Sequence, residues 1–389
     1  MAHEDHDAIY DLLAARGVSR RDFLKYCGSI AALLGLSQSF VPEIARALNT
    51  GARLQPAVWL HGGACTGCTE SMAQAGTPDI ATIVLDILSL EFADTLSMAQ
   101  GEDALAAAEA VFEREGEYIL IYEGSVMRGF DGNVLRIGGQ TGLYELEHAA
   151  PGAAAIIAVG SCAVDGGFVM ARPNPADATG VQMHLEEKGI TTPVINLPTC
   201  PMNPEWVVAI IVDALLLGTL ETGAILDKLD RFNRPTYIFG QTIHDNCPRR
   251  GHFENGSFVN EFGSEEEALG YCLYKVGCKG PQTYTNCPIV RWNRSVSWCV
   301  EAGAPCIGCG SLDWVDVGAP FLNRHRDLPL PNVGNTSPGL IAGAVAGVAA
   351  LGIGAHAVGM KVTGRMDEGA PYEEMKEHDR KRMKKGGGK

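Results

Sequence analysis

Cysteine is the residue type whose number and spacing in this chain could do chemistry. The 389 residues include 12 cysteines, too many for an ordinary core and too dilute for a small disulfide-packed domain. Cys27 stands apart near the N-terminus, and His244 completes the other eleven to twelve potential ligands. In chain order these form three groups of four: Cys65, Cys68, Cys162 and Cys200; His244, Cys247, Cys272 and Cys278; and Cys287, Cys299, Cys306 and Cys309.

The three groups favour iron–sulfur clusters. Such clusters are held by thiolates, with histidine as an occasional replacement, and a Cys-x2-Cys spacing lets neighbouring ligands reach two corners of one cluster. Structural zinc sites use similar donors, and disulfides suit an exported protein. Eleven cysteines cannot all pair, however, whereas twelve ligands divide evenly. Zinc, disulfides and free buried thiols remain the alternatives.

Four of the candidate ligands follow predicted strands. Short apolar segments alternate with helical ones such as 101–114, and the apolar segments are 57–60, 118–122, 155–159 and 194–197. Continuous apolar strands separated by helices predict a parallel sheet with helices on both faces. Ligands of such sheets gather beyond the carboxyl ends of the strands, where Cys65, Cys68, Cys162 and Cys200 lie.

Beyond about residue 218 the apolar periodicity fades and turn residues multiply. The ligands from His244 to Cys309 crowd into 66 residues of this segment. So loop-rich a segment buries too little apolar surface to be stable alone. We therefore expect bound clusters or metals to hold it together.

Both ends of the chain have the pattern of targeting segments. Arg20-Arg21, the apolar stretch 30–41 and the small-residue pattern Ala45-Arg46-Ala47 resemble a twin-arginine export signal over residues 1–47. The alternative is a short amphipathic helix with a chance arginine pair. Residues 338–360 carry no formal charge over 23 positions, enough to span a bilayer; the alternative is a buried soluble helix.

The charge pattern gives an orientation and excludes one class of partner. Lysines and arginines in the tail, residues 361–389, place it in the cytoplasm and the body on the periplasmic side of the cell membrane. His356 falls within the predicted span, and the sequence does not assign it a role. Residues 48–360 hold 34 acidic but only 17 basic residues, which makes nucleic acid an unsuitable partner.

The motifs around the cysteines resemble the small subunit of membrane-bound nickel–iron hydrogenases, essentially from end to end. They are Cys65-Thr66-Gly67-Cys68, Gly160-Ser161-Cys162, Pro198-Thr199-Cys200-Pro201, His244-x2-Cys247, Gly277-Cys278-Lys279-Gly280-Pro281 and Pro305-Cys306-Ile307-Gly308-Cys309. The resemblance implies an α/β fold: a flavodoxin-like parallel-sheet domain over 48–217, a loop-rich iron–sulfur domain over 218–337 and a transmembrane helix.

The resemblance also implies three clusters that transfer electrons in series. Cys65, Cys68, Cys162 and Cys200 would ligate a proximal 4Fe–4S cluster facing the nickel–iron centre of a separate large subunit. His244, Cys247, Cys272 and Cys278 would ligate a distal 4Fe–4S cluster, and Cys287, Cys306 and Cys309 a medial one between them. The chain would carry no catalytic residue of its own, be inactive alone and pass electrons to a membrane cytochrome b or another quinone-linked subunit. The alternative is an iron–sulfur subunit of another membrane respiratory complex, which would lack the segment 244–309.

Three positions depart from commoner versions of this family. Many members have proline where Cys299 stands and a 3Fe–4S medial cluster; a fourth thiolate predicts 4Fe–4S instead, with 3Fe–4S as the alternative. Oxygen-tolerant members carry extra cysteines at the positions of Gly67 and Gly167, so the glycines predict an ordinary, oxygen-sensitive proximal site. Ala64 stands where a glutamate is common, so no proton-path role transfers to it.

Overall fold

A five-stranded parallel sheet organises the first of two units of the chain. The computed structural model describes residues 19–34, 36–49, 55–76, 80, 83, 88–211, 213–214, 223–323, 328–330, 334–336, 338–363 and 365. The units are residues 1–324 and 325–389, and each is described by itself. The domain boundary predicted at 217–218 lies outside the described residues.

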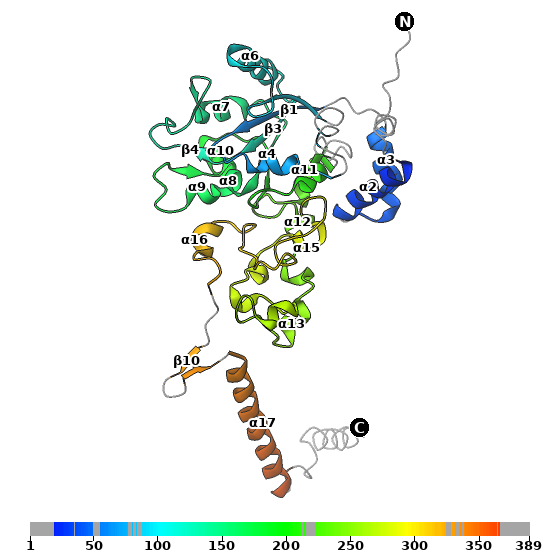
Figure 1. Ribbon diagram of the computed structural model, residues 1–389, viewed down its shortest axis with the longest axis vertical. Helices are drawn as coiled ribbons and strands as arrows, with labels where there is room; N and C mark the ends of the chain where they lie inside the picture. Colours follow the sequence, from blue (N-terminus) through cyan, green and yellow to red (C-terminus); the bar gives the residue numbers. More distant parts are fainter. Residues whose placement is uncertain are drawn as a thin grey trace, which may run out of the picture. The chain divides into compact units, whose positions relative to one another are not determined.

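The strand order of the sheet confirms the predicted fold class. The strands are β1 (Gln55–His61), β2 (Leu88–Ala93), β3 (Ile119–Glu123), β7 (Ala155–Val159) and β9 (Val194–Leu197), arranged β2-β1-β3-β7-β9 (Figure 1). Numbered along the chain, this is the order 2-1-3-4-5 of flavodoxin-like sheets. The edge strand β2, which pairs in parallel with β1, was not predicted from the sequence.

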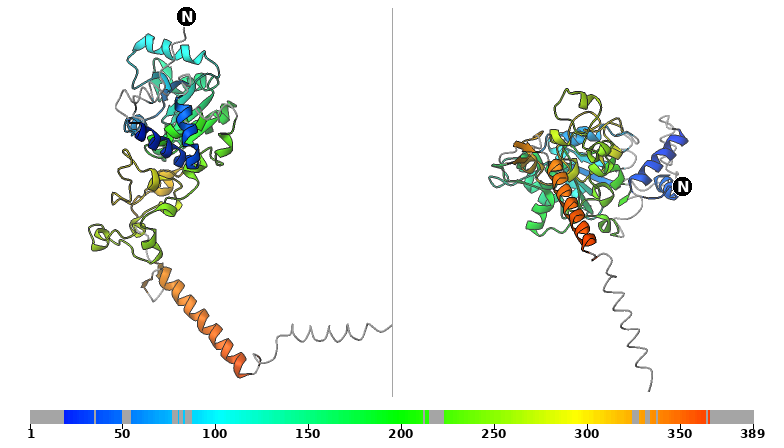
Figure 2. Two further views of the ribbon diagram at one scale, coloured as in Figure 1. Left: turned by 90° about the vertical axis from the view of Figure 1, so that its right-hand side faces the viewer. Right: turned by 90° about the horizontal axis from the view of Figure 1, so that it is seen from below.

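Helices cover both faces of the sheet. Along β1 the side chains alternate, so Ala57 and Trp59 enter one core while Val58 and Leu60 enter the other. The first core is covered by α4 (Gly67–Met72) and α11 (Pro204–Ile211), and the second by α6 (Gly101–Phe112), α7 (Gly142–Ala149) and α10 (Val181–Lys188) (Figures 1 and 2). Short elements complete this part: β4 (Val126–Met127) with β8 (Ala178–Thr179), β5 (Arg136–Ile137) with β6 (Gln140–Thr141), α8 (Gly160–Asp165) and α9 (Gly167–Met170).

The remainder of the first unit is loop-rich, as predicted. Its helices have at most five residues: η4 (Leu226–Lys228), α12 (Thr236–Phe239), η5 (His244–Asn246), α13 (Arg250–Glu254), α14 (Glu265–Ala268), η6 (Tyr274–Val276), η7 (Gly280–Gln282), α15 (Cys287–Val290) and α16 (Trp314–Gly318). Trp206 of α11 joins this region to the sheet. Its buried indole N–H donates to Asn286 Oδ1 over 2.9 Å, and its ring meets the rings of Phe239 and Trp292 at 5.1 and 6.2 Å.

The described part of the predicted export segment, from residue 19 onward, is mainly helical. Ser19 caps α2 (Arg20–Leu33) by accepting a hydrogen bond from the Asp22 amide, and η1 (Gln38–Phe40) leads into α3 (Val41–Asn49). Arg20 and Arg21 are exposed, whereas Cys27 is fully buried in the core that also contains Trp206. The apolar side of this segment therefore packs within the first unit.

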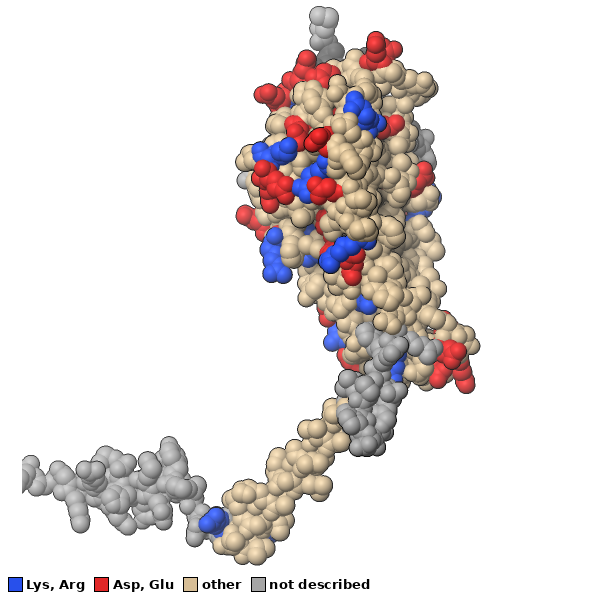
Figure 3. Space-filling view, turned by 90° about the vertical axis from the view of Figure 1, so that its left-hand side faces the viewer, with Lys and Arg blue, Asp and Glu red and all other residues tan. Residues whose placement is uncertain are grey.

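The second unit contains a two-stranded hairpin, β10 (Leu328–Leu330) with β11 (Gly334–Thr336), and the helix α17 (Pro338–Val362). Within α17, residues 341–362 are long and apolar enough to cross a membrane, with a mean hydropathy of 1.8. Large aliphatic side chains such as Leu351, 76% exposed, find no core in the described structure. Figure 3 shows this helix as an uncharged rod with basic side chains only at its end. The apolar C-terminal helix predicted from the sequence is thus present.

Candidate metal centres

The structure brings the four predicted proximal cysteines to the carboxyl edge of the sheet. Cys65 and Cys68 follow β1, Cys162 lies in α8 after β7, and Cys200 follows β9. Burial raises the pKa of the Cys200 thiol to about 11, and the nearby charges of Cys162 and Cys65 add to this shift. The Met202 amide donates to Cys68 Sγ over 3.4 Å. These contacts define a compact group of thiols beside the sheet.

Two glycines allow the backbone to close around this group. Gly160 has φ +84°, and a Cβ there would lie 2.5 Å from Cys68 Sγ, so any side chain would displace the thiol. Gly167 has φ +46°, and a Cβ there would meet the Cys162 amide nitrogen at 2.6 Å. The backbone at position 167 is therefore unsuited to the extra cysteine of oxygen-tolerant relatives.

A buried carboxylate supports the loop that carries Cys65 and Cys68. Glu123, the last residue of β3, accepts hydrogen bonds from the amides of Cys68 and Thr69 over 3.0 and 2.9 Å. The Thr69 hydroxyl donates to the same carboxylate over 2.6 Å. Sequence reasoning missed Glu123, because its contacts join residues that are more than fifty positions apart.

The distal group lies in the loop-rich region. His244 begins the short turn η5, and the Cys247 amide donates to its carbonyl over 3.3 Å. Burial raises the pKa of the Cys272 thiol to about 11, with further contributions from the charges of Cys278 and Cys247. The positive charge of Arg249 partly offsets the rise in the pKa of the Cys272 thiol. Arg249 Nη1 donates to the Tyr271 carbonyl over 2.9 Å. The sequence did not point to Arg249.

The medial group surrounds a cavity of about 300 Å³. Cys287, Cys299, Cys306 and Cys309 all line it, and so does Cys200 of the proximal group. Burial raises the pKa of the Cys287 thiol to about 12. The Thr285 hydroxyl donates to Cys287 Sγ over 2.9 Å and partly offsets this rise, whereas the charges of Cys306 and Cys299 increase it. Cys299 thus lines the same cavity as the three medial cysteines.

Neighbouring groups are linked by hydrogen bonds between the segments that carry them: Ser161 Oγ donates to the Cys309 carbonyl over 2.8 Å, and the Lys279 amide donates to the Cys306 carbonyl over 2.7 Å. Burial raises the pKa of the Cys309 thiol, and a hydrogen bond from the Cys200 backbone opposes that shift. Burial likewise raises the pKa of the Cys278 thiol, and a hydrogen bond from the Cys306 backbone opposes it. The proximal group therefore adjoins the medial one, and the medial group adjoins the distal one.

The donor set fits polynuclear iron–sulfur clusters. Thiols that line a cavity and whose pKa is raised by burial, such as Cys287, suit a multi-iron cationic core that would draw them into the thiolate form.

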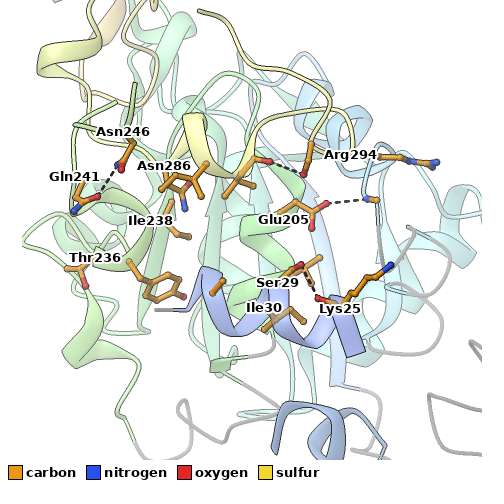
Figure 4. A pocket seen from close by; sticks show the side chains of 18 of the residues that line it. Lys25, Ser29, Ile30, Glu205, Thr236, Ile238, Gln241, Asn246, Asn286 and Arg294 are labelled. Carbon is orange, nitrogen blue, oxygen red and sulfur yellow. Dashed lines mark hydrogen bonds between the residues drawn. The ribbon is translucent and has the colours of Figure 1, made fainter. Parts of the chain in front are cut away.

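A second cavity, of about 1040 Å³, lies outside the cysteine groups. Figure 4 shows it between the export segment, with Lys25 and Ser29, and the body, where Glu205 accepts a hydrogen bond from the Gly76 amide over 3.2 Å. Part of its lining belongs to the predicted export signal.

The fold and the thiol groups define an iron–sulfur protein built on a flavodoxin-like domain. Two family models match the two parts of the chain. The model described as "NADH ubiquinone oxidoreductase, 20 Kd subunit" matches residues 65–214, and the model of the C-terminal part of the "NiFe/NiFeSe hydrogenase small subunit" matches residues 239–322. The second match covers the segment that a subunit of another respiratory complex would lack.

Relatives along nearly the whole chain agree with the second match. The "Quinone-reactive Ni/Fe-hydrogenase small chain" of Wolinella succinogenes is 40% identical over 355 residues, covering 89% of this chain and 97% of the relative. "Periplasmic [NiFe] hydrogenase small subunit 1" of Nitratidesulfovibrio vulgaris is 43% identical over 309 residues, covering 79% and 94%. A solved structure of recombinant [NiFeSe] hydrogenase from Desulfovibrio vulgaris Hildenborough aligns with a TM-score of 0.65 at 37% identity, covering 69% of this chain and 97% of that one.

The chain belongs to the small subunits of nickel–iron hydrogenases. It is therefore an electron-transferring iron–sulfur subunit that forms a heterodimer with a hydrogenase large subunit.

Proposed function

We propose that this chain carries three iron–sulfur clusters in series, between the hydrogen-activating centre of the large subunit and an acceptor in the membrane. The observation that carries the proposal is the pair of contacts that link the groups, Cys200 to Cys309 and Cys306 to Cys278. The ligand sets are those predicted from the sequence, with an ordinary, oxygen-sensitive proximal site beside Gly67 and Gly167. When bound, the clusters supply sites that accept and release single electrons.

The chain's own residues ligate these clusters, set their exposure to water and influence their charge. Cys287 and Cys306 are buried, which limits the contact of water with their side of the medial site, whereas Cys299 is exposed. Cys65 and Cys200 are exposed, which leaves the proximal site open to a partner subunit. At the other end, His244 is a neutral ligand that makes the distal site less negative than four thiolates would.

The overall proposal is tested by the colour of the purified heterodimer. Three clusters predict a broad visible absorption band that bleaches when hydrogen is added under anaerobic conditions. A colourless heterodimer, or one whose colour hydrogen leaves unchanged, would contradict the proposal.

Cys299 is proposed as the fourth ligand of the medial site, which makes that cluster 4Fe–4S. Iron analysis of the wild-type small subunit should give about twelve irons, and Cys299→Ser should lose about one. Ser297→Ala is the matched control, because Ser297 lines the same cavity without a thiol and should leave the iron content unchanged. A wild-type content of about eleven would assign the medial site to 3Fe–4S.

We also propose a topology in which the body faces the periplasm. The support is the exposed arginine pair of α2, the apolar surface of α17 and the basic residues that follow it. The names of the relatives, one periplasmic and one quinone-reactive, favour a quinone-linked membrane partner such as a cytochrome b. Protease added to inverted membrane vesicles should remove the tail after residue 360, whereas protease added to spheroplasts should not; the opposite pattern would overturn this topology.

A further inference from the structure

Three adjacent strands place ionisable residues in a row at the carboxyl edge of the sheet. His61 ends β1, Glu123 ends β3, and Asp94 directly follows β2. Because β2, β1 and β3 are neighbours and parallel, these three side chains meet beneath the loop that carries Cys65 and Cys68. The ligand sets described above do not include any of the three.

The imidazole of His61 lies between the two carboxylates. Its Nδ1 is 3.2 Å from Asp94 Oδ2, and its Nε2 lies 3.1 Å from Thr69 Oγ1 and 3.3 Å from Glu123 Oε2. The His61 amide also donates to Asp94 Oδ2, over 2.9 Å. The side chains of His61 and Glu123 are 8% and 3% exposed, so water screens this contact little. Burial opposes a charge on the ring, but the carboxylates prevail and raise the pKa of His61 to about 9.

Glu123 is held ionised by its donors. Besides the two backbone amides and the Thr69 hydroxyl, Trp59 Nε1 donates to it over 3.3 Å. The buried carboxylate is thus surrounded by hydrogen-bond donors. A buried anion bonded to the Cys68 amide disfavours further negative charge at the adjacent thiol group, unless a cation offsets it.

We propose that His61 is a positioning residue of the proximal site: as an imidazolium clamped between Asp94 and Glu123, it raises the reduction potential of the cluster held by Cys65, Cys68, Cys162 and Cys200. This inference rests on the proposed proximal ligand set. Reduction adds one electron to the site, and a nearby buried cation stabilises the more negative state. With one cation and two anions, the triad carries a net charge of −1 instead of −2.

An electrostatic role and a purely structural role of His61 predict different shifts of the proximal reduction potential. His61→Gln removes the cation and should lower the proximal potential. Asp94→Asn removes one anion while leaving the pair of His61 and Glu123, and should raise it. Loss of packing or hydrogen bonding alone would disturb both variants in the same direction, or broaden the titration without shifting it.

The test is a redox titration of the proximal cluster in the purified heterodimer, followed by electron paramagnetic resonance. His148→Gln is the matched control, because His148 also pairs with a carboxylate, Glu109 at 2.9 Å, but is exposed on α7. We expect a lower midpoint for His61→Gln, a higher one for Asp94→Asn, partial restoration by His61→Lys and no shift for His148→Gln. Equal midpoints in His61→Gln and wild type, or shifts of one sign in His61→Gln and Asp94→Asn, would overturn the inference.

If the proposed proximal ligand set is wrong, the redox titration gives a different result. In that case the wild-type heterodimer itself shows no proximal signal. If His61→Gln alone loses the signal by failing to fold, Asp94→Asn still decides: a raised midpoint supports the inference, and an unchanged or lowered midpoint overturns it.

Discussion

The proximal cysteines and the other ligands are positioned by different means. Cys65, Cys68, Cys162 and Cys200 follow strands of a sheet whose two faces are covered by helices and apolar cores. The medial and distal ligands lie among turns and helices of at most five residues. We therefore expect the proximal site to be preformed by the sheet and the other two sites to depend on the clusters that they bind.

The largest expected effect comes from removing a ligand in the loop-rich region. Cys306→Ala should leave residues 239–322 open to protease, because binding and folding are coupled in such segments and a structural metal contributes on the order of 10 kcal/mol. Cys162→Ala should leave residues 88–211 resistant, because the sheet keeps its core. Limited proteolysis with mass spectrometry of the fragments measures both. Equal resistance in the two variants would remove the distinction between the regions.

The next effect concerns the junction between the regions. Trp206→Ala removes a fully buried indole that contacts Phe239, Trp292 and Asn286, and should cost about 3–5 kcal/mol. Thermal unfolding should show both regions destabilised together. Phe168→Ala is the control, since Phe168 is 61% exposed and should change little. Destabilisation of the sheet alone would show that the loop region does not depend on this contact.

A smaller effect depends on pH and is confined to the sheet. The pKa of His61 is raised from 6.5 to about 9 in the folded protein, so its pairing stabilises the fold fully below about pH 6.5 and is lost as the pH rises through 9. The difference in unfolding free energy between wild type and His61→Gln should be about 3 kcal/mol larger at pH 6 than above pH 9. A difference that does not change with pH would mean that His61 is neutral.

The smallest expected change in stability separates backbone strain from contact with a ligand. Gly160→Ala and Gly303→Ala both place a side chain at positive φ, which costs about 1–2 kcal/mol. Only at position 160 would the added Cβ collide with a thiol, Cys68 Sγ, whereas position 303 opens to free space. Iron analysis and spectroscopy should therefore show loss of the proximal cluster in the first variant and retention of all clusters in the second. Retention of the proximal cluster in both variants would show that the cluster does not require glycine at position 160.

The two regions also differ in how far the sequence predicts them. Strand β7 and helix α6 were predicted because their apolar patterns are continuous and local. Strand β2 was missed, since Ser89 and Glu91 interrupt its apolar residues as suits an edge strand. The grouping of the cysteines could be read from their spacing and from a family resemblance.

The contacts around the cysteines could not be predicted. The pairing of Glu123 with the Cys68 loop and with His61 depends on which strands become neighbours, and the approach of Arg249 to the distal thiols depends on loop geometry. Neither leaves a local pattern in the sequence.

The central claim is that the sheet presents a preformed proximal site while the loop-rich region is ordered by the clusters that it binds. Hydrogen–deuterium exchange on the heterodimer, before and after anaerobic removal of iron by a chelator, tests it most directly. We predict that peptides from β3, β7 and β9 keep their slow exchange after iron removal, whereas peptides from residues 239–322 become fast. Slow exchange throughout 239–322 in the iron-free protein would contradict the claim.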